Sequence, residues 1–254
     1  MRTLISVALL LLATSVSAGS FWNDCSYTAP RNAAISAAGA SRIVIIARAG
    51  ELRVTGAPGA SEVRATGKAC SSEQSNLNDI TLVATRSGSE VRIEAKMPEF
   101  SGWRSVNALD FEVAVPNNVP LRIDDSSGEM RVEGVATADI HDSSGALHVR
   151  GVNGDLSIDD SSGEITVEHV TGHVTIEDSS GSIDVDDAGS VDIPDDGSGA
   201  VDIRHVKHNV TLGSKGSGGV SVSDVGGDFV VRHKGSGRID YERVAGRVDI
   251  PRRD

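Results

Sequence analysis

Apolar and polar residues alternate with a period of two in short stretches along the C-terminal half of the chain. Between residues 160 and 177 the apolar positions are Ile165, Val167, Val170, Val174 and Ile176. The same five positions return further along as Val201, Ile203, Val206, Val210 and Leu212. A period of two is typical of a strand that is buried on one face. Each stretch therefore predicts two short strands joined by a corner.

A turn sequence separates these stretches and occurs seven times. It reads Asp-Ser-Ser-Gly four times, then Asp-Gly-Ser-Gly, then Lys-Gly-Ser-Gly twice, and its first residues are Asp125, Asp142, Asp160, Asp178, Asp196, Lys215 and Lys234. The steps between them are 17 to 19 residues. A fixed period of this size is typical of a solenoid. Five aliphatic side chains cannot offset the conformational entropy lost by ordering one repeat alone, so the repeats must stack.

We therefore predict an all-β fold, a single-stranded β-helix or β-solenoid, and the lack of a hexapeptide period favours a right-handed coil. The expected parts are a signal peptide at 1–18, irregular β rungs or a cap at 19–124, and a regular seven-rung solenoid at 125–254. Within the irregular part, extended segments are expected at 43–47, 51–55, 62–67, 80–85, 90–95, 109–115 and 120–124. Two long interruptions, at 71–79 and 97–108, separate some of them.

The N-terminus has the pattern of a secretory signal peptide. Met1-Arg2 precedes the apolar run Leu4–Leu12, and Val16-Ser17-Ala18 ends in small residues, so cleavage is expected after Ala18. No other stretch approaches the length of a membrane-spanning helix. We expect an exported protein in the periplasm, at the cell surface or secreted. Cys25 and Cys70 would then form a disulfide, because such compartments oxidise thiols.

Charge and composition exclude some partners. The net charge is −12 and aromatic residues make up only 3% of the chain, whereas a nucleic-acid-binding protein needs a basic face with stacking rings. For the same reason we expect no direct electrostatic attraction to anionic lipid. The C-terminal Pro251-Arg252-Arg253 discourages strand addition, so we expect a monomer. Phe100 and Trp103 lie in the second long interruption, where they could contact a ligand or cover an open end of the solenoid.

The first position of the turns forms a column of carboxylates, Asp125, Asp142, Asp160, Asp178 and Asp196. Carboxylates stacked one strand apart repel each other. One interpretation is Ca²⁺ bound between rungs, since carboxylate and carbonyl oxygens are its ligands. The other is that each Asp accepts hydrogen bonds from its own turn while solvent screens the charge. The Gly-Gly-x-Gly-x-Asp turn of calcium-binding β-rolls is absent, which favours the second interpretation, and we expect no cofactor.

Two further columns are expected to face outward. The tenth position of each repeat holds Gly134, Gly151, His169, Asp187, His205, Asp224 and Arg243, and the ninth holds Glu133, Arg150, Glu168, Asp186, Arg204, Ser223 and Glu242. Their charges largely alternate, as neighbours across strands should. A metal site at His169, Asp187 and His205 is the less favoured alternative to such a ladder. Asp202, Asp240 and Arg204 could serve an enzyme, but no catalytic motif is present, so no enzyme is expected.

The turn sequences also carry a resemblance to a known family. Val115-Pro116, the segment from Ser126 to Val135, and the upstream Ala49 to Gly56 are similar to exported bacterial proteins of unknown function called "putative adhesins". The similarity spans about Ile43 to Ile250. It implies a β-helical fold with envelope or surface association, and it brings no catalytic residues.

Three functional hypotheses remain. The first is a non-enzymatic envelope protein with an adhesin-like binding or scaffolding surface, whose partner is an unidentified envelope protein or glycan. The second is a β-helix enzyme that acts on acidic polysaccharide. The third is a structural spacer stiffened by calcium.

Overall fold

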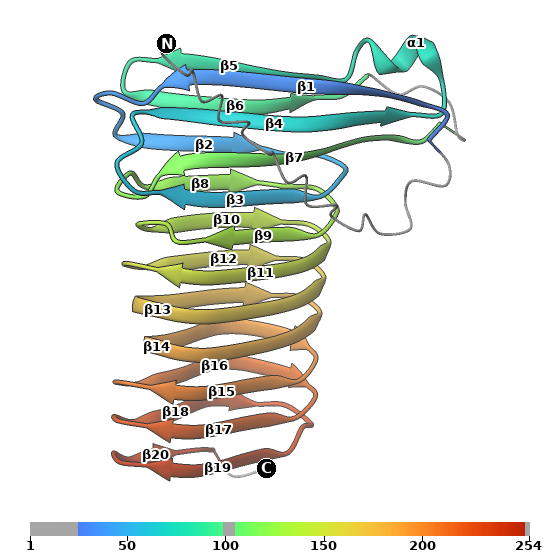
Figure 1. Cartoon of the computed structure of the whole chain (residues 1–254). Coiled ribbons are helices and arrows are strands. Elements are labelled where there is room, and N and C mark those ends of the chain that lie inside the picture. Colours follow the sequence, from blue (N-terminus) through green and yellow to red (C-terminus); the bar gives the residue numbers. More distant parts are fainter. Residues whose placement is uncertain (1–24, 99–104, 252–254) are drawn as a thin grey trace, which may run out of the picture.

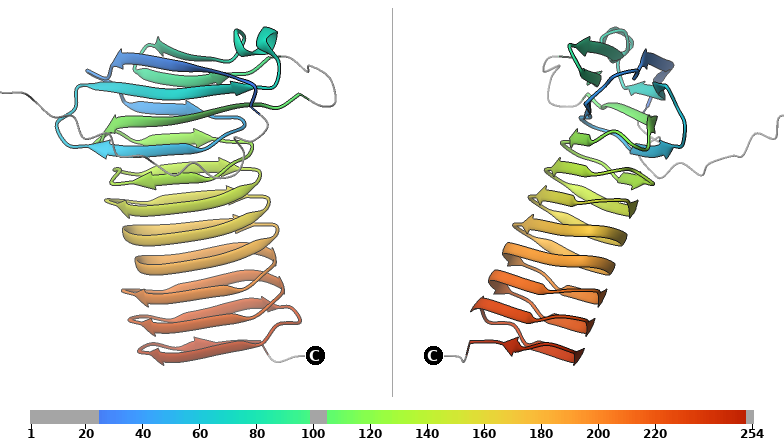
Figure 2. Two further views of the ribbon diagram at one scale, coloured as in Figure 1. Left: turned by 45° about the vertical axis from the view of Figure 1, so that its right-hand side comes forward. Right: turned by 90° about the vertical axis from the view of Figure 1, so that its left-hand side faces the viewer.

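The computed structural model describes residues 25–98 and 105–251, which form an elongated, nearly all-β molecule. The chain coils into a β-solenoid of about seven turns in which each rung contributes one strand to each of two facing sheets (Figures 1 and 2). The predicted signal peptide, Phe100 and Trp103 lie outside the described residues.

The regular part consists of parallel strands that begin and end close to the Ser-Gly turns. Their bounds are β9 Met130–Glu133, β10 Ala138–Asp142, β11 Gly145–Val152, β12 Leu156–Asp160, β13 Gly163–Asp178, β14 Gly181–Ser198, β15 Val201–Val206, β16 Val210–Ser217, β17 Val220–Val225, β18 Phe229–Lys234, β19 Ile239–Val244 and β20 Val248–Asp249. One sheet stacks β9, β11, the start of β13 and of β14, β15, β17 and β19; the other stacks β10, β12, the ends of β13 and β14, β16, β18 and β20.

The register confirms the stacking that the repeat predicts. Ile165 lies beside Ile183, and Ile183 beside Val201, in parallel ladders. Equivalent core residues of neighbouring rungs are therefore one strand spacing apart, about 4.8 Å. In Figure 1 the nearer strands β15, β17 and β19 point left and the more distant β16 and β18 point right as the chain descends, so the coil is right-handed.

A single aliphatic core runs between the two sheets. Ile165, Val167, Val170, Val174 and Ile176 are all at most 1% exposed, as their spacing predicts. The core continues without a break into the N-terminal part through Ile123 and Met130. Packing along the whole axis therefore stabilises each rung through its neighbours.

In each rung a corner joins the strand of one sheet to the strand of the other. The tenth position of each repeat lies at this corner and has a left-handed backbone. Gly134 and Gly151 have φ of 67° and 70°, and the equivalent residues His169, Asp187, His205, Asp224 and Arg243 have φ between 52° and 58°. This conformation costs an L-residue about 1–2 kcal/mol. The packed strands on either side of each corner hold it in place.

The N-terminal part closes one end of the solenoid with strands of both directions. Its elements are β1 Tyr27–Ser36, β2 Arg42–Ile46, β3 Leu52–Ala57, β4 Glu62–Ser71, α1 Gln74–Leu77, β5 Thr81–Ser87, β6 Glu90–Lys96, β7 Asn107–Pro116 and β8 Leu121–Asp124. Strands β2 and β3 insert between later rungs: β2 pairs with β6 and β8, and β3 with β7 and β9. Beyond them the antiparallel strands β4 and β1 extend one sheet, and β5 extends the other.

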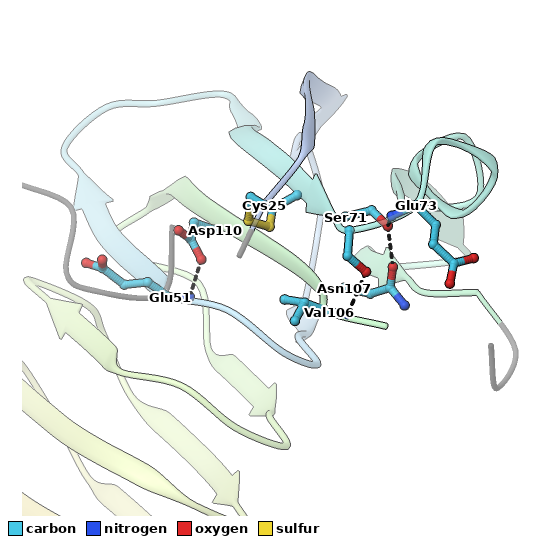
Figure 3. Close-up of a disulfide and its surroundings, with 9 residues drawn as sticks. Cys25, Glu51, Ser71, Glu73, Val106, Asn107 and Asp110 are labelled. Carbon is cyan, nitrogen blue, oxygen red and sulfur yellow. Dashed lines mark hydrogen bonds between the residues drawn. A yellow bond between two sulfur atoms is a disulfide. The ribbon is translucent and has the colours of Figure 1, made fainter. Parts of the chain in front are cut away.

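Long side chains and a disulfide hold this cap together. Arg31 donates to the carbonyl oxygens of Leu77 and Ile80, while Arg86 donates to those of Ser36 and Ala38. The predicted disulfide joins Cys25 to Cys70 beside the hydrogen-bonded Ser71 and Asn107 (Figure 3). The opposite end differs, because the apolar residues of the last rung, Ile239, Val244, Val248 and Ile250, are only partly buried.

Candidate functional site

An open depression of about 500 Å³ lies on the β15–β17–β19 sheet near the C-terminal end. Three consecutive rungs line it with residues of both charges, Asp202, Arg204, His205, Ser221, Val222, Ser223, Asp224, Asp240, Tyr241, Glu242 and Arg243. The parallel register places them, because it stacks Asp202, Ser221 and Asp240 in one column and Arg204, Ser223 and Glu242 in the next. The sequence analysis named Asp202, Arg204 and Asp240, and the structure brings all three together.

Ion pairs fix the charged groups of this depression. Arg204 Nη2 donates to both carboxylate oxygens of Asp184, at 3.0 and 3.2 Å, and its Nη1 lies 3.2 Å from Asp202 Oδ1. Arg243 donates from Nε and Nη2 to the two oxygens of Asp224, at 2.6 and 2.8 Å. Planar groups held in this way present their remaining donors and acceptors in fixed directions.

His205 lies beside the carboxylates of Asp186 and Asp224. Its Nδ1 lies 2.6 Å from Asp186 Oδ1 and its Nε2 lies 3.9 Å from Asp224 Oδ2. The hydrogen bond with Asp186 raises the pKa of His205, and the Arg243 guanidinium lowers the pKa of Asp224. His169, Asp187 and His205 occupy equivalent left-handed corners. No group of three or more His, Cys, Asp or Glu residues in 25–98 and 105–251 is arranged to hold a metal ion.

Tyr241 is the exposed aromatic residue of this region, with 51% of its surface accessible. It lies beside Val222 in an inward-facing column, and its ring centroid is 6.2 Å from that of Phe229. The ring is exposed because, within the described residues, no rung follows that of β19 and β20 to cover it. Tyr241 therefore belongs to the uncovered end of the core as well as to the depression.

The second candidate is the column of turn carboxylates, which lies inside the molecule. Asp125, Asp142, Asp160, Asp178 and Asp196 are only 1–7% exposed. The expected hydrogen bonds to the turns are present: Asp142, Asp160 and Asp178 accept from the backbone N–H of Ser144, Ser162 and Ser180 at 3.0–3.3 Å. The expectation that solvent screens these charges is wrong. Alternate residues of each strand point into the core, and each Asp follows an inward-facing residue by two positions, as Asp160 follows Ile158.

Burial changes the acidity of these carboxyl groups. Desolvation raises the pKa of Asp125 to about 7 and that of Asp160 to about 6, and it also raises the pKa of Asp142, Asp178 and Asp196. The neighbouring carboxylates above and below contribute to the shift at Asp160. Lys215 follows Asp196 in the column, and its Nζ lies 2.7 Å from Asp196 Oδ2 with both side chains at most 2% exposed.

Comparison with solved structures finds likenesses at low sequence identity. A structure described as a "putative adhesin" from Bacteroides fragilis NCTC 9343 is 11% identical, with a TM-score of 0.54, over 89% of this chain and 99% of that one. A "putative cell adhesion protein" from Clostridium sporogenes ATCC 15579 is 14% identical, with a TM-score of 0.39, over 88% and 100%. A "putative lipid binding protein" from Parabacteroides distasonis ATCC 8503 is 14% identical, with a TM-score of 0.37, over 87% and 97%.

Of these likenesses, that to the Bacteroides fragilis structure bears on the fold, and on the fold alone. The first shows that the chain shares its fold with a bacterial protein described as an adhesin, which agrees with the resemblance in the turn sequences. No protein-family model matches the chain, and no curated protein matches it. Among the described residues the single helix, α1, has four residues, and no helix is long and apolar enough to cross a membrane.

Proposed function

We propose that the protein is an exported, non-enzymatic component of the cell envelope that binds an envelope glycan in an adhesin-like manner. The depression on β15, β17 and β19 carries the proposal, because it offers fixed carboxylate, guanidinium and hydroxyl groups on an exposed face. Such groups hydrogen-bond the hydroxyls of a sugar. A net negative protein with four acidic residues in the depression favours a neutral or amino glycan over an acidic one.

The charged side chains of the depression form ion pairs with one another, which favours a binding role over a catalytic one. Both arginines and His205 already contact carboxylates, so the depression presents ion pairs where a glycosidase would present an isolated acid and base. The fold shared with a protein described as an adhesin is in keeping with this role.

Binding of isolated envelope saccharides to the immobilised protein tests the proposal. Arg204→Ala should weaken binding tenfold or more, because it removes donors and releases Asp184 and Asp202. Arg150→Ala is the matched control, since Arg150 occupies the same column three rungs away and pairs with Glu168 at 3.6 Å. Equal losses in both variants, or no saccharide bound by the parent protein, would refute the assignment.

Export is the other half of the proposal. The hydrophobic N-terminal run and the disulfide between Cys25 and Cys70 support it, because disulfides persist in oxidising compartments. Mass spectrometry of the protein from the periplasmic, surface and secreted fractions should find a chain that begins at Gly19. A chain recovered from the cytoplasm with Met1 and reduced cysteines would contradict it.

A further inference from the structure

Buried carboxylate oxygens without a protein partner mark the interior of the turn column. In Asp125, Asp142, Asp160 and Asp178 the Oδ1 atom accepts a backbone hydrogen bond, while the buried Oδ2 has no hydrogen-bond partner within the described chain. An unpaired buried polar atom costs about 1–3 kcal/mol, and more when it is charged. Four such atoms in one column indicate a group that the protein chain alone does not supply.

Lys215 shows what kind of group this column accepts. Its ammonium lies within the column and contacts three oxygens: Asp196 Oδ2 at 2.7 Å, the carbonyl oxygen of Gly199 at 2.9 Å, and the carbonyl oxygen of Ser217. One carboxylate and two turn carbonyls therefore form a cation site between two rungs. The cation in this site is the ammonium group of Lys215 itself.

The same oxygens recur in the rungs above, where no lysine is present. The register stacks Asp142, Asp160, Asp178, Asp196 and Lys215 in order, and it stacks Ser198 on Ser217. The counterparts of the Lys215 contacts, one rung up, are the Asp178 carboxylate and the carbonyls of Gly181 and Ser198. The carbonyl of Ser217 already accepts from the N–H of Gly199 while it contacts Lys215, so accepting one backbone hydrogen bond does not prevent contact with a cation.

The spacing selects the ion. Equivalent residues on parallel strands are about 4.8 Å apart, so an ion midway between two stacked carboxylate oxygens would lie about 2.4 Å from each. This is the distance of Ca²⁺ from its oxygen ligands, about 2.3–2.6 Å, whereas Mg²⁺ requires about 2.0–2.1 Å and near-ideal octahedral geometry. Two carboxylates and two carbonyls are all hard oxygen ligands.

We propose that the column binds Ca²⁺ between adjacent rungs, held by the carboxylates of Asp142 and Asp160 or of Asp160 and Asp178 together with the Gly and Ser carbonyls of the same turns. Asp160 is the central ligand because it borders both positions. The inference is independent of the glycan site, which lies on the outer face of β15, β17 and β19.

Thermal unfolding of the purified protein in chelator, in Ca²⁺ and in Mg²⁺ tests the proposal. With Ca²⁺ at about one hundred times its Kd, the Tm should rise by roughly 5–10 °C over the chelated protein. Mg²⁺ should leave the Tm unchanged. Asp160→Asn should diminish the response to Ca²⁺, because the carboxamide retains the shape of the side chain and loses the charge.

Asp159→Asn is the matched control, since it removes the same charge from the neighbouring residue, whose side chain is 64% exposed. Its response to Ca²⁺ should equal that of the parent protein. Equal effects of Ca²⁺ and Mg²⁺, or an undiminished response in Asp160→Asn, would overturn the proposal and leave protons as the neutralising species. If Asp160→Asn does not fold, direct calcium titration of the parent protein by calorimetry decides, and no saturable heat overturns the inference.

Discussion

At the scale of single residues, the most unusual feature is a row of carboxyl groups inside an aliphatic core. Asp160 is 2% exposed, and burial raises its pKa to about 6. Its neighbours Asp142 and Asp178 have raised pKa values for the same reason. A carboxyl group with a raised folded-state pKa stabilises the fold only while it is protonated. The free energy of unfolding must therefore depend on pH.

We expect the metal-free protein to lose stability as pH rises from about 4 to about 7. Unfolded aspartates release their protons near pH 4, whereas Asp160 and Asp125 hold theirs until about pH 6 and 7, so the folded state binds more protons across this window. Urea unfolding in chelator at a series of pH values measures the effect. Asp160→Asn should weaken the dependence of the free energy of unfolding on pH, and it should raise this free energy by about 1–3 kcal/mol at pH 7. A stability that increases from pH 4 to pH 7 would contradict the expectation.

The sequence predicted which residues form this column but not where their side chains lie. The repeat of the turn motif located Asp160 above Asp178, and the structure confirms that register. Because aspartate is charged, the sequence analysis expected these side chains to be exposed to solvent. The signal for burial is the phase of the strand, because Asp160 follows Ile158 by two residues. The contacts of Lys215 required the structure, since its carbonyl partners lie in two different turns.

At the scale of elements, the corner between strands is the part of the rung that local sequence specifies least. Gly134 and Gly151 suit its left-handed backbone, whereas His169 adopts the same conformation at φ 58°. The sequence analysis interpreted the tenth position of each repeat as a ladder of alternating charges, and this interpretation did not consider the backbone conformation. Two glycines at equivalent positions were the available indication of a positive φ.

His169→Gly should stabilise the protein by about 0.5–1 kcal/mol. Relief of the left-handed strain contributes about 1–2 kcal/mol, and the greater freedom of glycine in the unfolded chain offsets part of it. His169 is exposed, so little packing is lost. Gly151→Ala at the same position of another rung should have the opposite sign, because a Cβ there meets no atom closer than 3.6 Å and only the backbone is strained. Urea unfolding of both variants checks the pair, and changes of the same sign would contradict the explanation.

At the scale of the whole molecule, the stacked rungs and most strands of the cap were predictable, whereas the order in which the cap strands pair was not. The extended segments between 43 and 124 appear close to their predicted positions as β2 to β8. The additional strand β1, Tyr27–Ser36, carries only a weak apolar alternation of small residues. The insertion of β2 and β3 between later rungs could not be predicted, because the repeat that aligns the other rungs is absent there.

Removal of one complete rung should leave a folded protein. Deletion of residues 163–180 joins Ser162 to Gly181 and restores an Asp-Ser-Ser-Gly turn, so β14 can take the place of β13 on β11 and β12. Circular dichroism should show retained β-structure with a lower Tm, because one nearest-neighbour interface is lost. Binding at the distant depression should persist.

Deletion of only residues 163–171 is the control, since it removes one strand of the rung and places the next strand on the wrong sheet. It should abolish cooperative unfolding. Similar folding of both deletions would show that the rungs do not act as units.

The two ends of the molecule differ in how readily evolution could change the number of rungs beside them. One end is closed by antiparallel strands, two arginines and a disulfide, whereas the last described strands at the other end, β19 and β20, form a rung like those before it. Unequal exchange between the similar gene segments that encode the rungs can therefore lengthen or shorten the rod while its sealed extremity stays intact. Relatives with the same cap and a different number of rungs would therefore differ in the length of the solenoid and in the distance between its two ends.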